Sequence, residues 1–197
     1  MKNGGHVTDN LPIVRYDAKA GSRTMDLMRW RLVPYWAKDI KIGFSTINAM
    51  AETIDTKPVF REAFRRRRCI VPVDNSYEWK KLGPKEKQPY AIALADRSLM
   101  ALAGLWESWR SPANETIRSF TIVTTMPNEL CGELHNRMPV ILPPDTWSTW
   151  LGESEPVEPE QLKELLVPYA GPTVAWPVSQ RVGNVKNNDA TLIEPII

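Results

Sequence analysis

Short apolar segments separated by polar turns recur along most of the chain. Alternating or continuous apolar residues predict strands, a weak one at 11–14 and a short one at 44–49, where the entry to a loop is the alternative. Turn residues such as Asp74-Asn75-Ser76 separate several of these segments. The other predicted strands lie at 25–36, 69–73, around 77–79, 90–95, 99–109, 120–125, 140–142 and 174–182, the last of which closes the sheet.

Prolines followed by periodic apolar residues predict short helices between these strands. The first helix has Pro58 in its first turn and Phe60 and Phe64 on one face, and it ends within a run of arginines. The others are predicted after Pro127, carrying Leu130, Leu134 and His135; after residues 143–145, carrying Trp147 and Trp150; and at 159–166.

Many short strands in hairpin order with a few short helices predict an α+β fold around a mainly antiparallel, barrel-like sheet. A chain of 197 residues, of which 43% are hydrophobic and 24% charged, is long enough to bury a full core. No internal repeat or low-complexity segment divides the sequence. We therefore expect residues 1–197 to form one domain.

The N-terminal part of the sequence contains no apolar core of signal-peptide length. No segment reaches the roughly 18 uninterrupted apolar residues of a membrane span. We therefore expect a cytoplasmic protein with no membrane partner. Two cysteines, Cys69 and Cys131, are too few for a disulfide framework or a four-ligand metal site, so no metal is expected. A single disulfide is the alternative to two free thiols.

The formal net charge is only +2, but five arginines fall within eight positions. Such a local patch attracts a phosphate backbone, whereas the alternative is a solvated helix end where arginines favour the negative pole. The eight tryptophans leave a similar choice, because exposed indoles stack on unpaired bases but most tryptophans lie in cores. The arginines are Arg61, Arg65, Arg66, Arg67 and Arg68.

Three polar residues are candidates for chemistry. His135 is one of only two histidines and precedes an apolar run. It is either a helix-end histidine or a general acid, because histidine titrates near neutrality. Glu78 faces opposite to Tyr77 and Trp79 if this segment is a strand, so it points either to solvent or into a cleft where its pKa is raised. Asn48 either orients a substrate or completes a turn.

Several common catalytic motifs are missing from the sequence. It contains no G-x-x-x-x-G-K-[ST], H-E-x-x-H, G-x-S-x-G or paired C-x-x-C pattern. The commonest nucleotide-binding, zinc-protease, hydrolase and zinc-finger functions are therefore not indicated.

An ordered set of motifs along most of the chain is more specific than any single residue. It includes Arg29-Trp30-Arg31-Leu32-Val33-Pro34, Asn48-Ala49 with Glu52, Tyr77-Glu78-Trp79, Ala103-Gly104-Leu105-Trp106-Glu107, Thr124-Thr125 and His135-Asn136-Arg137-Met138-Pro139-Val140. In this combination the sequence resembles the SOS response-associated peptidase family, the abasic-site processing proteins.

The resemblance implies binding of single-stranded DNA and covalent capture of the ring-opened aldehyde of an abasic sugar, without a cofactor, by a protein that we expect to be a monomer. The nucleophile of the family is a cysteine directly after the initiator methionine, whose amine and thiol together close a thiazolidine. Glu78 would accept and donate protons during methionine removal and sugar ring opening, His135 would assist proton transfer to the sugar oxygen, and Asn48 would hold the sugar or the N-terminus. The implied DNA-binding residues are Arg137, Trp30, Trp36, Arg61, Arg65 and Thr124.

The sequence departs from the family pattern at several positions. Residue 2 is Lys2, so we expect the domain to be truncated at its N-terminus. Cys69 and Cys131 do not replace the missing nucleophile, since their nitrogens are amides. Arg31 stands where the motif usually has glycine, which predicts backbone strain, and Met50 replaces a basic or polar residue.

Two origins are compatible with these departures: a truncated copy of an active protein, or a decayed relative that retains the fold. The decayed relative would be a non-catalytic module that binds single-stranded DNA. A peptidase that acts on other proteins is a further alternative, but no serine or cysteine dyad in the sequence supports it.

Overall fold

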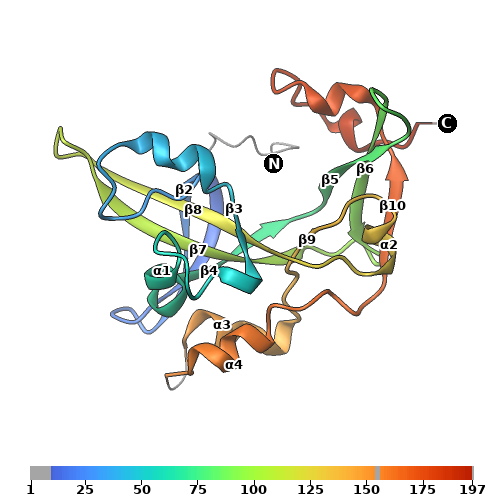
Figure 1. The fold of residues 1–197 in the computed structure, drawn as a ribbon. Coiled ribbons are helices and arrows are strands. Elements are labelled where there is room, and N and C mark those ends of the chain that lie inside the picture. The colour runs from blue at the N-terminus through green and yellow to red at the C-terminus, as the bar shows by residue number, and fades with distance from the viewer. Residues whose placement is uncertain (1–9, 154–155, 197) are drawn as a thin grey trace.

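The computed structural model describes residues 10–153 and 156–196, and its fold is drawn in Figure 1. The strands are β1 (Asn10–Asp17), β2 (Ser22–Trp30), β3 (Asn48–Met50), β4 (Arg68–Val73), β5 (Ser76–Lys81), β6 (Lys87–Leu94), β7 (Met100–Arg110), β8 (Thr116–Thr125), β9 (Met138–Pro139) and β10 (Thr173–Pro177). The α-helices are α1 (Arg61–Arg66), α2 (Glu129–Gly132), α3 (Trp147–Leu151) and α4 (Pro159–Glu164). The 3-10 helices are η1 (Ile40–Ser45), η2 (Ala51–Thr53), η3 (Pro144–Thr146), η4 (Gln180–Gly183) and η5 (Ala190–Ile193).

Five strands form a closed sheet in the order β2-β1-β4-β7-β8, because β2 also pairs with β8. The β2–β8 pairing is parallel and short, at Arg29 and Trp30, whereas the pairings along the rest of this ring are antiparallel. Strand β3 adds to β8 in parallel, and β9 pairs with β8 in antiparallel fashion. The predicted α+β fold with a mainly antiparallel, barrel-like sheet is therefore confirmed.

A second, three-stranded sheet has the order β10-β6-β5 and lies at the end of the molecule opposite the β1–β2 hairpin (Figure 1). The prediction that residues 174–182 close the main sheet was wrong. Strand β10 pairs with β6 instead, from Thr173 opposite Leu94 to Pro177 opposite Tyr90. The strand ends at Pro177, since proline donates no ladder hydrogen bond, and η4 follows it.

The boundaries of several other elements differ from the prediction. The strand predicted at 25–36 ends at Trp30, because Arg31 has a φ of 100°, in the left-handed region that favours glycine. The strain predicted for an arginine at this position is thus present. The helix expected to carry His135 ends at Gly132, and His135 lies in the loop that follows. The segment 140–142, predicted as a strand, forms only an isolated bridge between Leu102 and Ile141, and the two-residue strand β9 lies directly before it.

The core consists of two apolar clusters. One contains buried residues from all five strands of the closed sheet, such as Ile13, Met28 and Phe120, and therefore lies inside the barrel. The other includes Phe64 of α1 and Trp150 of α3, and it lies between the sheet and the helices (Figure 1). No helix within the described parts of the chain is long and apolar enough to span a bilayer.

Glycine is required where β4 and β7 approach each other. A Cβ at Gly104 would lie 2.9 Å from the Cys69 sulfur and 3.1 Å from the Thr121 carbonyl oxygen.

Cys69 is itself fully buried, and burial raises the pKa of its thiol far above the ordinary value. Both cysteines are free thiols, so the alternative of a disulfide is wrong.

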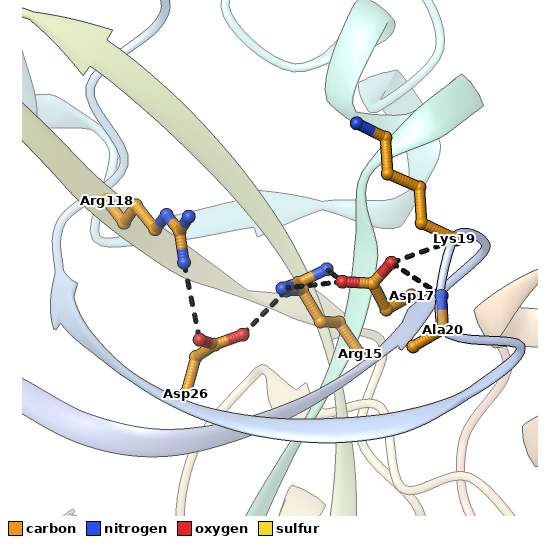
Figure 2. Close-up of polar contacts among 6 residues, drawn as sticks. All are labelled: Arg15, Asp17, Lys19, Ala20, Asp26 and Arg118. Atoms are coloured by element: carbon orange, nitrogen blue, oxygen red, sulfur yellow. Dashed lines mark hydrogen bonds and ion pairs between the residues drawn. The ribbon is translucent and has the colours of Figure 1, made fainter.

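Charged residues cluster where the β1–β2 hairpin meets β8 (Figure 2). The Arg15 Nε donates to Asp26 Oδ2 over 2.6 Å, and Arg118 donates to Asp26 Oδ1 over 3.3 Å. Asp17 accepts from Arg15 and from the backbone N–H groups of Lys19 and Ala20, which lower the pKa of its carboxyl. These contacts tie the hairpin turn and β8 together.

Candidate functional site

Glu78 lies on β5 with its side chain directed into a pocket. The carboxylate shares a strand face with Ser76, and both residues line the pocket, whereas Tyr77 and Trp79 do not. The Glu78 side chain is 25% exposed. Of the two alternatives for Glu78, the structure thus supports the cleft-lining one. The pocket is lined by Ser76, Glu78, Ile92, Met100, Leu102, Cys131, Arg137, Met138, Pro139 and Ile141.

His135 faces Glu78 from the loop that follows α2. Its Nδ1 atom lies 3.9 Å from Glu78 Oε2, within ion-pair distance for a protonated imidazole but too far for a direct hydrogen bond. The backbone N–H of His135 donates to the Cys131 carbonyl over 2.8 Å. The backbone N–H of Arg137 lies 3.2 Å from His135 Nδ1 and donates to it when that nitrogen is unprotonated, while the Arg137 carbonyl, 3.4 Å away, accepts from it when it is protonated.

The electrostatic surroundings of Glu78 favour its neutral form. Burial in the largely apolar pocket raises the pKa of the Glu78 carboxyl, and a positive charge on His135 partly offsets this rise. No group within residues 10–153 and 156–196 hydrogen-bonds to the carboxylate. Burial, together with the nearby Glu78 charge, raises the pKa of the Cys131 thiol to about 11. Glu78 is therefore suited to exchange protons, and Cys131 stays a neutral thiol at physiological pH.

A second group of predicted residues is joined to this pocket through Arg137. The Arg137 guanidinium makes two hydrogen bonds to the Glu52 carboxylate, of 2.6 and 3.0 Å. It also donates to the Thr124 carbonyl over 2.6 Å and lies 3.3 Å from the Thr124 hydroxyl. The Arg137 contact holds the pKa of Glu52 below its ordinary value. Arg137 and Thr124, both predicted to bind DNA, are thus brought together.

Asn48 begins β3, which runs parallel to the end of β8. It is exposed and lies opposite Ile122, while Met50 of the same strand lies opposite Thr124. The strand therefore aligns Asn48 with the segment of β8 that supports Arg137. Asn48 does not line the pocket itself.

The other residues predicted to bind DNA lie outside the pocket. Trp30 is partly buried, stacks on Phe120 and donates from Nε1 to the Ile47 carbonyl over 2.9 Å. Trp36 is 46% exposed in the loop between β2 and η1. Arg61 and Arg65 are exposed on α1, and Arg65 lies 3.9 Å from Glu62.

The arginine run divides into exposed and structural residues. Arg61, Arg65 and Arg66 are exposed. Arg67 forms a 2.6 Å ion pair with Glu107, whose side chain is only 4% exposed. Arg68 donates to backbone carbonyls of α1 and of Trp150. Neither alternative for the run describes Arg67 and Arg68, which make internal contacts, and the exposure of the other three arginines is compatible with both.

Sequence reasoning missed two features of the site. Cys131 at the pocket wall gave no signal beyond being one of two cysteines. The pairing of Glu52 with Arg137 joins residues 85 positions apart, which no local pattern reveals. Charged motif residues of opposite sign, Glu52 and Arg137, were the only available hint.

The fold and the pocket define a class of protein: a closed mixed barrel that carries a carboxylate–imidazole pair. The family described as SOS response associated peptidase (SRAP) matches residues 5–185, and the chain belongs to this family.

Relatives and solved structures agree with this membership. The chain is 47% identical to the abasic site processing protein YoqW of Bacillus subtilis (strain 168) over 168 residues, which cover 85% of this chain and 75% of that protein. It is 32% identical to the abasic site processing protein HMCES of Mus musculus over 209 residues, covering 91% of this chain and 59% of that protein. A crystal structure of a protein from Bacteroides thetaiotaomicron superimposes with a TM-score of 0.85 at 28% identity, covering 95% of this chain and 82% of that one.

Proposed function

We propose that this chain processes abasic sites in DNA as part of the DNA damage (SOS) response, and that it binds the lesion in single-stranded DNA. The observation that carries the proposal is the Glu78–His135 pair in a pocket of a protein whose relatives are named for abasic site processing. A carboxyl with a raised pKa beside an imidazole is the arrangement that general acid–base chemistry uses.

The proposed reaction begins with opening of the abasic sugar, which is mostly a cyclic hemiacetal. Ionised Glu78 accepts the proton of the C1 hydroxyl, the bond between C1 and the ring oxygen breaks, and the ring oxygen takes a proton from protonated His135. The product is an aldehyde with a free C4 hydroxyl, and the proton on Glu78 then passes to neutral His135, 3.9 Å away, which restores both groups. No metal or cofactor takes part in this proposal.

DNA binding is proposed for exposed residues around this pocket. Trp36 offers an exposed indole for base stacking, and Arg61 and Arg65 offer charges for phosphates. Arg137 is already engaged by Glu52, so we assign its main effect to the organisation of the site, with any phosphate contact shared with that carboxylate.

The covalent step needs a thiol next to a free amine, because an imine formed by the amine closes to a thiazolidine only if the thiol adds to the same carbon. Residue 2 is Lys2. Cys69 and Cys131 are buried and their nitrogens are amides. We therefore propose that the thiazolidine forms only when the N-terminal residue is a cysteine, and that residues 10–196 supply the groups that bind the DNA and transfer protons. Peptidase-type removal of an initiator methionine would precede this link.

The test compares the 197-residue chain with a version extended upstream so that its processed N-terminus is a cysteine. Each is mixed with single-stranded DNA that carries one abasic site, or with the same DNA lacking it, and run on a denaturing gel. We expect a shifted band only from the extended version and only with the abasic DNA. Fluorescence anisotropy should show noncovalent binding by both versions.

Two other outcomes contradict parts of the proposal. Noncovalent binding without any covalent band from either version would indicate the alternative, a DNA-binding module without catalysis. Absence of DNA binding by both versions would contradict the proposed function altogether.

A further inference from the structure

Glu52 is a carboxylate outside the pocket that contacts Arg137, a residue of the pocket wall. Glu52 belongs to η2, directly after β3, whereas Arg137 directly precedes β9. Their ion pair connects these two segments by two parallel hydrogen bonds, the geometry in which an arginine–carboxylate pair is most specific.

The Arg137 guanidinium is held from three sides. Besides the Glu52 carboxylate, it contacts the backbone carbonyl and the hydroxyl of Thr124 on β8. Its Nη1 atom also lies 4.0 Å from the Met126 sulfur. The Arg137 side chain is only 18% exposed. Such a side chain is an anchor, because its planar group has one orientation that satisfies all of these partners.

The backbone of Arg137 also contacts His135 directly. The two residues are separated by one position, and the Arg137 backbone N–H donates to His135 Nδ1. On the other side, the His135 backbone is tied to α2 through the Cys131 carbonyl. The imidazole therefore depends on Arg137 for its orientation, and its only attractive contact with Glu78 is the 3.9 Å approach across the pocket.

We propose that Glu52 is a positioning residue: through its bidentate ion pair with Arg137 it holds the loop 133–137 so that the His135 ring faces the Glu78 carboxylate. The inference deepens the proposed function, on which its catalytic meaning rests. The geometric claim itself concerns only the free protein.

The test measures the pKa of Glu78 by carbon-13 NMR of glutamate carboxyls, with the Glu78 signal assigned from its loss in Glu78→Gln. His135→Gln calibrates the method: loss of the imidazole charge raises the pKa of Glu78, since that charge lowers it. In Glu52→Gln, displacement of His135 raises the pKa of Glu78 in the same direction.

The sign of the shift separates positioning from a simple charge effect. Removal of the Glu52 charge leaves Arg137 unneutralised beside the pocket, and by itself this lowers the pKa of Glu78. A rise in Glu52→Gln therefore supports the proposal, while a fall or no change overturns it. Glu52→Asp keeps the charge but shortens the reach, so we expect a smaller rise, and this variant serves if Glu52→Gln does not fold.

The matched control is Glu153→Gln, which breaks another bidentate pair, between Arg23 and Glu153. Neither of these residues lines the pocket. The control should leave the pKa of Glu78 unchanged, and a rise there equal to that of Glu52→Gln would overturn the proposal. Because no DNA is needed, this test stands even if the chain fails to process abasic sites.

Discussion

Two charged clusters of the protein differ in how fully their charges are satisfied. At the β1–β2 hairpin, both oxygens of Asp26 are bonded to arginines, and Asp17 is bonded to Arg15 and to backbone N–H groups (Figure 2). At the pocket, Glu78 has no hydrogen bond within the described residues, and His135 approaches it only to 3.9 Å.

The difference separates structural charges from reactive ones. A carboxylate whose oxygens both accept hydrogen bonds from arginines is already engaged by the protein and has less capacity left for a ligand. Glu78 has a pKa raised by burial and free lone pairs directed at a pocket, which is the condition of a group that exchanges protons with a substrate. We therefore expect the hairpin cluster to contribute to stability, and we propose that the pocket pair takes part in the chemistry.

The largest expected effect is on the reaction. In the version with an N-terminal cysteine, Glu78→Gln should slow formation of the covalent band by about 10²–10⁴-fold, the usual contribution of a general acid–base group. Time courses on denaturing gels with excess protein measure this rate. Asp26→Asn is the matched control and should react at the wild-type rate. Equal rates for Glu78→Gln and wild type would remove Glu78 from the mechanism.

For stability the order is reversed, and the hairpin cluster should contribute more than the pocket pair. Asp26→Asn weakens contacts to two arginines, one of which, Arg15, has a side chain that is only 14% exposed and lies over the Trp106 ring. We expect a loss of about 1–2 kcal/mol in the free energy of unfolding, typical of hydrogen bonds to charged groups. Urea denaturation measures this change. A loss below the error of the method would mean that these ion pairs make no measurable contribution to the free energy of unfolding.

Much of the fold was predictable because hairpin strands leave local signals. Apolar segments and turn residues located most strands, and the ordered motifs indicated the family and a barrel-like sheet. The family motif also predicted that position 31 suits glycine, and the φ of 100° at Arg31 agrees with this prediction. The mistaken elements are those set by distant partners: β10 pairs with β6, and α2 ends before His135.

The candidate site was predictable in its residues but not in its connections. Glu78, His135, Arg137 and Thr124 were named from motifs, yet their grouping depends on contacts between distant segments. The arginine run shows most clearly what the sequence could not predict. The structure is needed to see that Arg67 and Arg68 make internal contacts, whereas Arg61 and Arg65 are exposed to solvent.

The most direct test of the contrast between the clusters is the thermal stability of Glu78→Gln as a function of pH. The folded-state pKa of Glu78 lies above its unfolded value, so the stability linked to its neutral form is present below the unfolded pKa and is lost as pH rises through the folded pKa. Glutamine has no such loss. The melting temperature of Glu78→Gln relative to wild type should therefore increase between about pH 4 and about pH 8. A difference that is constant or decreases over this range would contradict the claim that partial burial favours the neutral form of the Glu78 carboxyl.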